Sequence, residues 1–232
     1  MDNKAKLGLL LLLFCALSVV FQNITVSHIA KDSRPFTMFE FIAPTSVALF
    51  SPAVGVAAIL FSEFIQRFVL NQFEYSLFNV VRLFTLVAAA YYFGTVLKDK
   101  KFGIVLPIAG MLLFWIHPVG AQAWAYALLW IIPIAATFLS GNLLFRSLGA
   151  TFQAHVIGSV AYLYLASSFG PEYWMALIPL VLVERATYAA GIALTFIAFN
   201  SLLEFAKSEW KVSLPGVHVE KQYSLLRAKK EG

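Results

Sequence analysis

Residues 52–70 read PAVGVAAILFSEFIQRFVL, an apolar stretch long enough to cross a membrane that nevertheless carries Glu63 and Arg67. The rest of the chain has the same character: 60% of its 232 residues are hydrophobic, only 12% are charged, and the mean hydropathy is +0.80. A soluble domain of this size cannot hide so much apolar surface. The sequence therefore predicts an integral membrane protein. A charge inside a bilayer costs at least about 2.5 kcal/mol, so it usually faces a partner or a wet cavity.

Breaks in hydropathy, together with proline and glycine, divide the chain into about eight apolar segments. They are residues 7–29, 37–50, 53–70, 77–97, 102–117, 120–139, 148–168 and 173–206. Segments 37–50 and 102–117 are short for a hydrocarbon core of about 30 Å, so they either span it or re-enter. We expect an all-α, polytopic membrane helix bundle over residues 1–206, with about six to eight transmembrane segments, followed by a basic cytoplasmic tail over 207–232.

The positive charges predict how the bundle is oriented. With eight spans and a cytoplasmic N-terminus, all of the 17 Lys and Arg residues fall on the cytoplasmic side except Lys31, Arg34, Arg67, Arg82 and Arg185. Lys31 and Arg34 fall on the outer side of the membrane, and the three arginines Arg67, Arg82 and Arg185 lie within spans. Because cytoplasmic loops of membrane proteins are enriched in Lys and Arg, we predict cytoplasmic termini and a multi-pass location in the cell membrane.

Several classes of function find no support in the sequence. Cys15 is the only cysteine, which excludes an intramolecular disulfide and CxxC chemistry. The four histidines lack the spacing of a metal site, and no phosphate-binding loop is present. Lysines scattered beside a membrane are not typical of nucleic-acid binding. We therefore expect no metal, no cofactor, no catalytic residues and no nucleic-acid partner.

In the predicted orientation, a set of polar side chains falls in the outer half of the membrane. The set is Glu40, Glu63, Arg67, Arg82, His117 and Gln122, with Trp115, Trp124, Tyr126 and Trp130 nearby. Glu63 and Arg67 are spaced i,i+4, so they share a helix face and can pair. One interpretation is a set of buried ion pairs beside an interfacial belt of aromatic residues. The other is a solute pocket that opens outward, with aromatic walls and a few polar anchors.

A second group of ionisable residues lies near the C-terminal end of the bundle. Glu184 and Arg185 are adjacent, hence about 100° apart on a helix, and we expect each to need its own partner. His155, with Gln153 close to it in the preceding segment, is the candidate partner. These residues form either a structural tie between the last two helices or a proton relay or coupling site.

One stretch resembles a known family of transport proteins. Residues 36–50 (FTMFEFIAPTSVALF), the turn at residues 50–55 (FSPAVG) and the helix that carries Glu63 are similar to part of the substrate-binding S components of energy-coupling-factor (ECF) vitamin transporters. They match the short second helix, the turn and the third helix. The family's turn usually reads FGPxxG, and Ser51 replaces its first glycine. The family's first helix often carries an AxxxA face for the coupling subunit, and residues 7–29 have none. Over residues 36–67, the resemblance implies a small helix bundle with an outward pocket.

The leading hypothesis is a substrate-specific transporter subunit that binds a vitamin- or metabolite-like solute from the outer side. The outer polar set would line or gate the pocket, and Trp115, Trp124 and Tyr126 would stack on a flat solute. The expected partners are the lipid bilayer, the solute, and a separate membrane coupling subunit with ATPases. The alternative is an accessory or structural subunit of a larger membrane complex. A stand-alone carrier or channel and a membrane enzyme are further possibilities.

Overall fold

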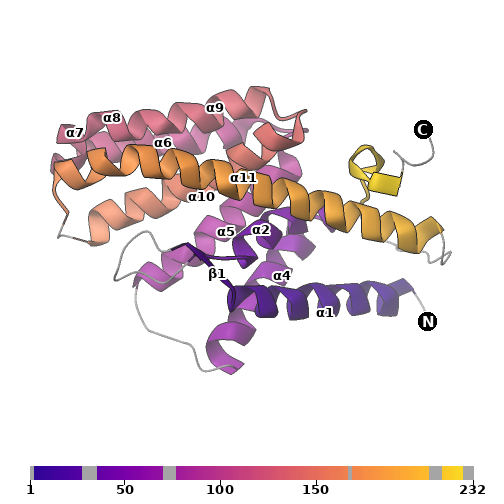
Figure 1. Ribbon diagram of the computed structural model, residues 1–232. Helices are drawn as coiled ribbons and strands as arrows, with labels where there is room; N and C mark the ends of the chain where they lie inside the picture. The colour runs from indigo at the N-terminus through magenta and orange to yellow at the C-terminus, as the bar shows by residue number, and fades with distance from the viewer. Residues whose placement is uncertain (1–2, 28–35, 70–76, 167–168, 209–215, 227–232) are drawn as a thin grey trace. The chain divides into compact units, whose positions relative to one another are not determined.

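The structure, a computed structural model, describes residues 3–27, 36–69, 77–166, 169–208 and 216–226 and is almost entirely helical (Figure 1). It divides into two compact units, one formed by Met1–Phe73 with Gly191–Gly232 and the other by Glu74–Ala190. The all-α prediction is thereby confirmed. In the described ranges, three helices are long and apolar enough to cross a membrane, namely Ala5–Gln22, Pro52–Val69 and Pro171–Ser208.

The first unit begins with helix α1 (Asn3–Gln22) and a small antiparallel pair of strands, β1 (Thr25–Ser27) and β2 (Phe36–Thr37). The helix is shorter than the predicted segment 7–29. The side-chain amide of Asn23 donates to the carbonyl oxygen of Val19 (2.7 Å), which satisfies one of the carbonyls left open at the helix end. Residues 28–29 of the predicted segment lie outside the described residues.

The predicted segment 37–50 forms an interrupted helix of α2 (Phe39–Ile42), a 3-10 turn η1 (Ala43–Thr45) and α3 (Ser46–Leu49). Pro44 causes the interruption because it has no backbone N–H to donate. The hydroxyls of Thr45 and Ser46 donate to the carbonyl oxygens of Ile42 and Ala43 (2.7 and 2.8 Å). The interrupted segment therefore stays hydrogen-bonded, but it is too short to cross a bilayer unaided.

Helix α4 (Pro52–Phe64) follows a tight turn and continues as a π-helical segment, η2 (Ile65–Val69). The hydroxyl of Ser51 accepts a hydrogen bond from the backbone N–H of Val54 (3.4 Å), and Pro52 occupies the first helical turn. A Cβ added to Gly55 would lie 2.6 Å from the backbone nitrogen of Val47. Glycine is therefore required where the backbones of α3 and α4 approach each other.

Helix α11 (Pro171–Ser208) supplies its last part to the first unit, where residues 216–226 pack back against the helices. The backbone N–H of His218 donates to the carbonyl oxygen of Leu49 (2.7 Å), and that of Glu220 donates to the side-chain oxygen of Asn200 (2.7 Å). Within this stretch lies the short 3-10 turn η4 (Lys221–Tyr223). This part of the polar tail is thus held in place by backbone hydrogen bonds.

The second unit is built on α5 (Leu77–Thr95), α6 (Lys101–Ile116) and α10 (Leu143–Leu165), with the first part of α11. Between α6 and α10, the predicted segment 120–139 is broken into four short pieces. They are α7 (Pro118–Gln122), α8 (Trp124–Ala127), the 3-10 turn η3 (Leu128–Trp130) and α9 (Ile131–Phe138). Helix α10 packs on α5, α6 and α9, and α6 packs on α7, α8 and α9.

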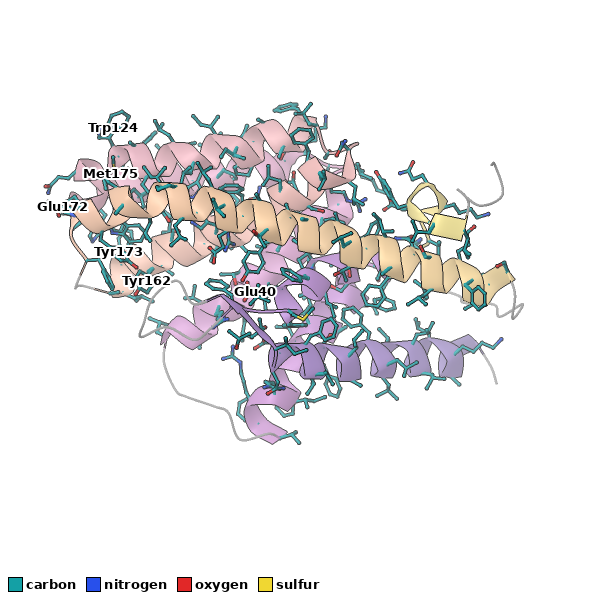
Figure 2. All side chains as sticks on the ribbon, in the orientation of Figure 1. Glu40, Trp124, Tyr162, Glu172, Tyr173 and Met175 are labelled. Atoms are coloured by element: carbon teal, nitrogen blue, oxygen red, sulfur yellow. The ribbon has the colours of Figure 1, made fainter. Side chains whose placement is uncertain are left out.

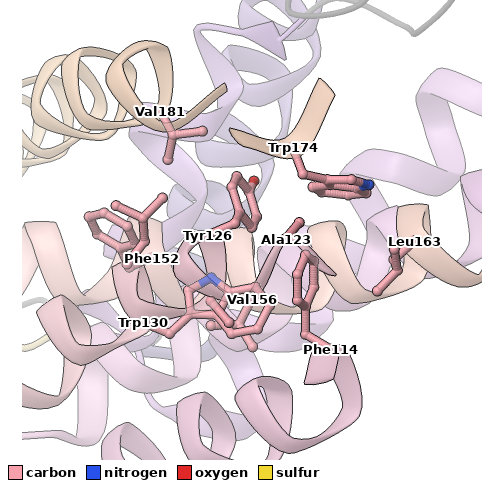
Figure 3. Packing of buried hydrophobic residues seen from close by; sticks show 11 residues of the cluster. Phe114, Ala123, Tyr126, Trp130, Phe152, Val156, Leu163, Trp174 and Val181 are labelled. Atoms are coloured by element: carbon pink, nitrogen blue, oxygen red, sulfur yellow. The ribbon is translucent and has the colours of Figure 1, made fainter. Parts of the chain in front are cut away.

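The core of the second unit is an aromatic cluster formed by Phe114, Tyr126, Trp130 and Trp174, with smaller apolar side chains between the rings (Figure 3). Phe114 lies at its centre: its ring centroid is 5.4 Å from that of Tyr126, 5.5 Å from that of Trp130 and 5.3 Å from that of Trp174. Offset and edge-to-face contacts at such distances are favourable. The cluster collects rings from α6, α8, η3 and α11.

Candidate functional site

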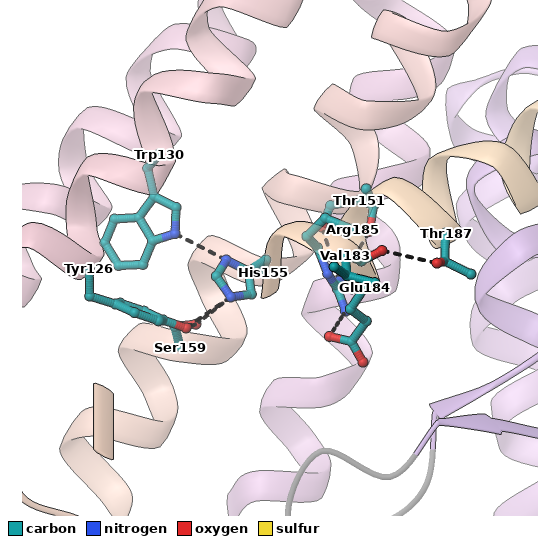
Figure 4. Close-up of polar contacts among 9 residues, drawn as sticks. All are labelled: Tyr126, Trp130, Thr151, His155, Ser159, Val183, Glu184, Arg185 and Thr187. Atoms are coloured by element: carbon teal, nitrogen blue, oxygen red, sulfur yellow. Dashed lines mark hydrogen bonds and ion pairs between the residues drawn. The ribbon is translucent and has the colours of Figure 1, made fainter. Parts of the chain in front are cut away.

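A polar network around His155 lies against this aromatic cluster (Figure 4). The indole N–H of Trp130 donates to Nδ1 of His155 (3.2 Å). The other ring nitrogen, Nε2, lies 2.9 Å from the hydroxyl oxygen of Tyr126 and 3.3 Å from that of Ser159. The two hydroxyl oxygens are 3.1 Å apart. Four polar side chains therefore form one connected set, in which Tyr126, Trp130 and Ser159 are buried and His155 is half-buried.

Helical spacing explains how the four residues meet. His155 and Ser159 are four residues apart on α10, so they lie on one face of that helix. Tyr126 and Trp130 are also four residues apart, on the helical stretch that runs from α8 into η3. Each pair thus presents its polar atoms to the other.

The hydrogen bonds fix the protonation state of His155. An indole nitrogen can only donate, so Nδ1 of His155 must be the acceptor and cannot carry a proton. The imidazole is therefore neutral, with its proton on Nε2. That proton is donated to the hydroxyl oxygen of Tyr126 or Ser159. The site is consequently an uncharged one.

Trp174 is the fourth ring of the aromatic cluster, and it differs from Tyr126 and Trp130 in its hydrogen bonding. It comes from the first turns of α11, is only 2% exposed, and has its ring centroid 5.0 Å from that of Tyr126. Its indole nitrogen makes no hydrogen bond with any residue that the structure describes. A buried polar hydrogen without an acceptor is uncommon in proteins and costs roughly 1–3 kcal/mol.

Glu184 and Arg185 form an ion pair with each other (2.7 Å), which corrects the expectation that each needs its own partner. The Cα–Cβ bonds of adjacent helical residues point about 100° apart, but the long side chain of Arg185 can bend back to reach Glu184. Arg185 also donates to the hydroxyl of Thr151 on α10 (3.1 Å) and lies over the ring of Tyr188. His155 is not the predicted partner, because both of its ring nitrogens are engaged elsewhere.

In the first unit, the predicted pairing of Glu63 with Arg67 is confirmed by an ion pair at 2.8 Å, with both residues buried. The pair spans the junction between α4 and the π-helical segment. Beside it, the side-chain amides of Gln66 and Asn23 exchange two hydrogen bonds (3.3 and 3.4 Å). Glu40 lies in the first turn of α2 and is half-buried.

The other predicted ligand-binding residues belong to the second unit, and two of them, His117 and Gln122, hydrogen-bond to the backbone at the start of α7. His117 accepts a hydrogen bond at Nδ1 from the backbone N–H of Val119 (3.3 Å) and so caps α7. Gln122 is exposed, and its amide donates to the carbonyl oxygen of Pro118 (3.3 Å). Arg82 is half-buried on α5.

The predicted aromatic residues separate into a surface pair and one buried residue. Trp124 is 57% exposed and projects away from the helices (Figure 2). Its carbonyl oxygen accepts a hydrogen bond from the indole N–H of Trp115 (3.0 Å). Tyr126, by contrast, is buried in the network with His155. Of the nine residues predicted to bind a ligand, Tyr126 is the one found in this network.

The site also contains three residues that were not predicted from the sequence: Ser159, Phe114 and Trp174. The signal that could have found Ser159 is its i,i+4 spacing from His155 on one apolar helix. No comparable signal marks Phe114 or Trp174, which reach the cluster only through tertiary packing. Among the described residues, no three His, Cys, Asp or Glu side chains gather as they would at a metal site.

Comparisons with protein-family models, with curated proteins and with solved structures give no match to this chain.

Proposed function

We propose that this chain is a multi-pass membrane protein that binds a small, vitamin- or metabolite-like organic solute in its second unit. It would act as the substrate-specific subunit of a transporter in a prokaryotic cell membrane and take the solute from the outer side. The observation that carries the proposal is the hydrogen-bonded set around His155, which shares Tyr126 and Trp130 with the aromatic cluster that also holds Phe114 and Trp174. Small-molecule sites combine apolar, aromatic walls with a few placed polar groups in this way.

The outer surface of the helices supports a membrane location. Ile116, Val183 and Leu194 are 74%, 68% and 68% exposed, an arrangement that suits lipid far better than water. The exposed pair Trp115 and Trp124 lies near the ends of α6 and α8, where it suits the interfacial belt of a bilayer. Polar groups buried within such a protein are expensive and usually functional.

The transport role draws on the resemblance of residues 36–67 to the S components of ECF transporters. The close approach of Gly55 to α3 gives a physical reason for the glycine that ends this turn. Because the sequence contains no phosphate-binding loop, the energy would come from ATPases on separate chains, through a membrane coupling subunit. The polar anchors on this proposal are His155 and Ser159 rather than the helix-end residues His117 and Gln122.

The alternative, an accessory subunit whose ionisable groups pair with those of a partner, draws less support from the ion pairs. Glu63 pairs with Arg67, and Glu184 pairs with Arg185, within this chain. A partner's charges are therefore not needed to neutralise these four residues.

Native mass spectrometry of the protein extracted from its own membrane tests the proposal. We expect the spectrum to show the chain with one small organic molecule, which is lost on collisional heating. A stoichiometric protein partner with no small molecule would support the accessory role instead. The bare chain alone, from cells grown in rich medium, would contradict the transport proposal.

A further inference from the structure

The polar network leaves one hydroxyl hydrogen without an acceptor. Nε2 of His155 carries a proton and can only donate, so neither hydroxyl can donate to it. The contact between the hydroxyls of Tyr126 and Ser159 uses one of their two hydrogens. The other hydrogen has no acceptor within the network. The network therefore offers a spare donor.

Trp174 offers a second spare donor in the same cluster, since its buried indole N–H has no acceptor among the residues that the structure describes. Of the three cluster rings that carry a polar hydrogen, Trp174 is the one that a ligand can displace with the smallest loss of hydrogen bonds. Trp130 would lose its hydrogen bond to His155, and Tyr126 would lose those to His155 and Ser159, whereas the indole nitrogen of Trp174 makes none within the described part of the chain. Displacement of Trp174 from Tyr126 and Phe114 would open a slot lined by aromatic faces.

We infer that the solute is an uncharged, planar ring bearing a carbonyl-type acceptor, and that it binds beside Trp174 and accepts a hydrogen bond from its Nε1–H. This inference rests on the proposed function and names its substrate class. The walls of the slot are flat rings, which favour a flat solute. Both spare groups are donors, so the solute has to supply an acceptor.

The same surroundings exclude charged solutes. The cluster contains no ionised side chain, His155 is neutral by its hydrogen bonding, and the nearby charges of Glu184 and Arg185 neutralise each other. An ion buried without a counter-ion costs far more than a neutral group that completes hydrogen bonds. A cation would also face donors where it needs acceptors.

Three probes of nearly the same shape test the inference: benzamide, benzamidine and benzoate. Benzamide is neutral with a carbonyl acceptor, benzamidine is a cation that only donates, and benzoate is an anionic acceptor. The full-length protein, in micelles and with its five tryptophans replaced by 5-fluorotryptophan, would be titrated with each. The variant Trp174→Phe assigns the fluorine resonance of Trp174. We expect benzamide alone to shift this resonance saturably.

Affinity measurements on two variants add a second test. Trp174→Phe keeps an aromatic ring but removes the donor, so we expect benzamide to bind about tenfold more weakly. Ser140→Ala changes a buried serine outside the cluster and should bind benzamide as the wild type does. If Trp174→Phe does not fold, the fluorine titration of the wild-type chain still decides the question.

Two results would overturn the inference: a Trp174 resonance that benzamide leaves unmoved, or one that benzamidine or benzoate moves as much. Failure of the proposed function is distinguishable from both. A protein that carries its own solute in native mass spectrometry while benzamide leaves Trp174 unmoved would refute only this site and substrate class. A protein that retains no solute would refute the transport role itself.

Discussion

Two tryptophans of the aromatic cluster form a matched pair for testing the hydrogen bond that keeps His155 neutral. Trp130 and Trp174 are 0% and 2% exposed and both contact Phe114 edge-on, but among the residues described only Trp130 finds a hydrogen-bond partner for its indole nitrogen. Substitution by phenylalanine removes a similar amount of buried ring in both cases. The difference in unfolding free energy between the two variants therefore reports the contact with His155, together with the relief of the unpaired indole N–H that Trp174→Phe removes.

We expect Trp130→Phe to be less stable than Trp174→Phe by at least about 1–3 kcal/mol, the cost of leaving the ring nitrogen of His155 without its partner, because the loss of the unpaired N–H in Trp174→Phe acts in the same direction. A change of tautomer cannot relieve this cost. If the proton moves to Nδ1, the hydroxyl of Tyr126 can donate to Nε2, but Nδ1–H of His155 then lacks an acceptor. For a chain of this length, 2 kcal/mol corresponds to about 4–8 °C in melting temperature.

The assay is thermal unfolding in micelles, on protein washed free of any retained solute, since a ligand would stabilise the wild type unequally. Near-ultraviolet circular dichroism of both variants would confirm that the cluster is still packed. Equal melting temperatures for the two variants would refute the hydrogen-bonding scheme for His155. A lower melting temperature for Trp174→Phe would show that the indole N–H of Trp174 has a partner after all.

Two further predictions concern the first unit. Gly55→Ala should lower the unfolding free energy by about 1–3 kcal/mol, because the new methyl group meets backbone at 2.6 Å, whereas Gly8→Ala, with nothing within 4 Å, should not destabilise. Equal thermal stability of the two variants would contradict the close approach of α3 and α4. Asn200→Leu removes the acceptor for the backbone N–H of Glu220, so trypsin should cleave within residues 216–226 faster than in the wild type. An unchanged cleavage rate, at unchanged helicity, would count against the docking of this segment.

The positions of the long helices could be predicted from hydropathy, because each of them coincides with a continuous apolar stretch of sequence. The breaks inside the segments were harder to foresee. Pro44 interrupts the segment 37–50, and four short pieces replace one helix over residues 120–139. In both places hydropathy stays high through the break, because the irregular turns are as apolar as the helices around them.

For the candidate site, contacts within one helix could be predicted from the sequence, whereas contacts between helices could not. The ion pair of Glu63 and Arg67 follows from their i,i+4 spacing, so the sequence alone was enough to predict it. The contact of His155 with Tyr126 joins residues 29 apart in the sequence, and nothing in either segment specifies it. Trp174 reaches the cluster only because α11 packs there. Partners across helices depend on packing that a hydropathy pattern does not encode.

The most direct test of the proposed solute site compares two buried serines by native mass spectrometry. Ser159→Ala removes a hydroxyl from the network with His155, whereas Ser140→Ala removes one that lies in the turn after α9 and donates to the carbonyl oxygen of Thr137. We predict that the Ser140→Ala protein retains the same small molecule as the wild type, while the Ser159→Ala protein, equally folded, emerges without it. Equal retention of the molecule by both variants would contradict the assignment of this network as the place where the solute binds.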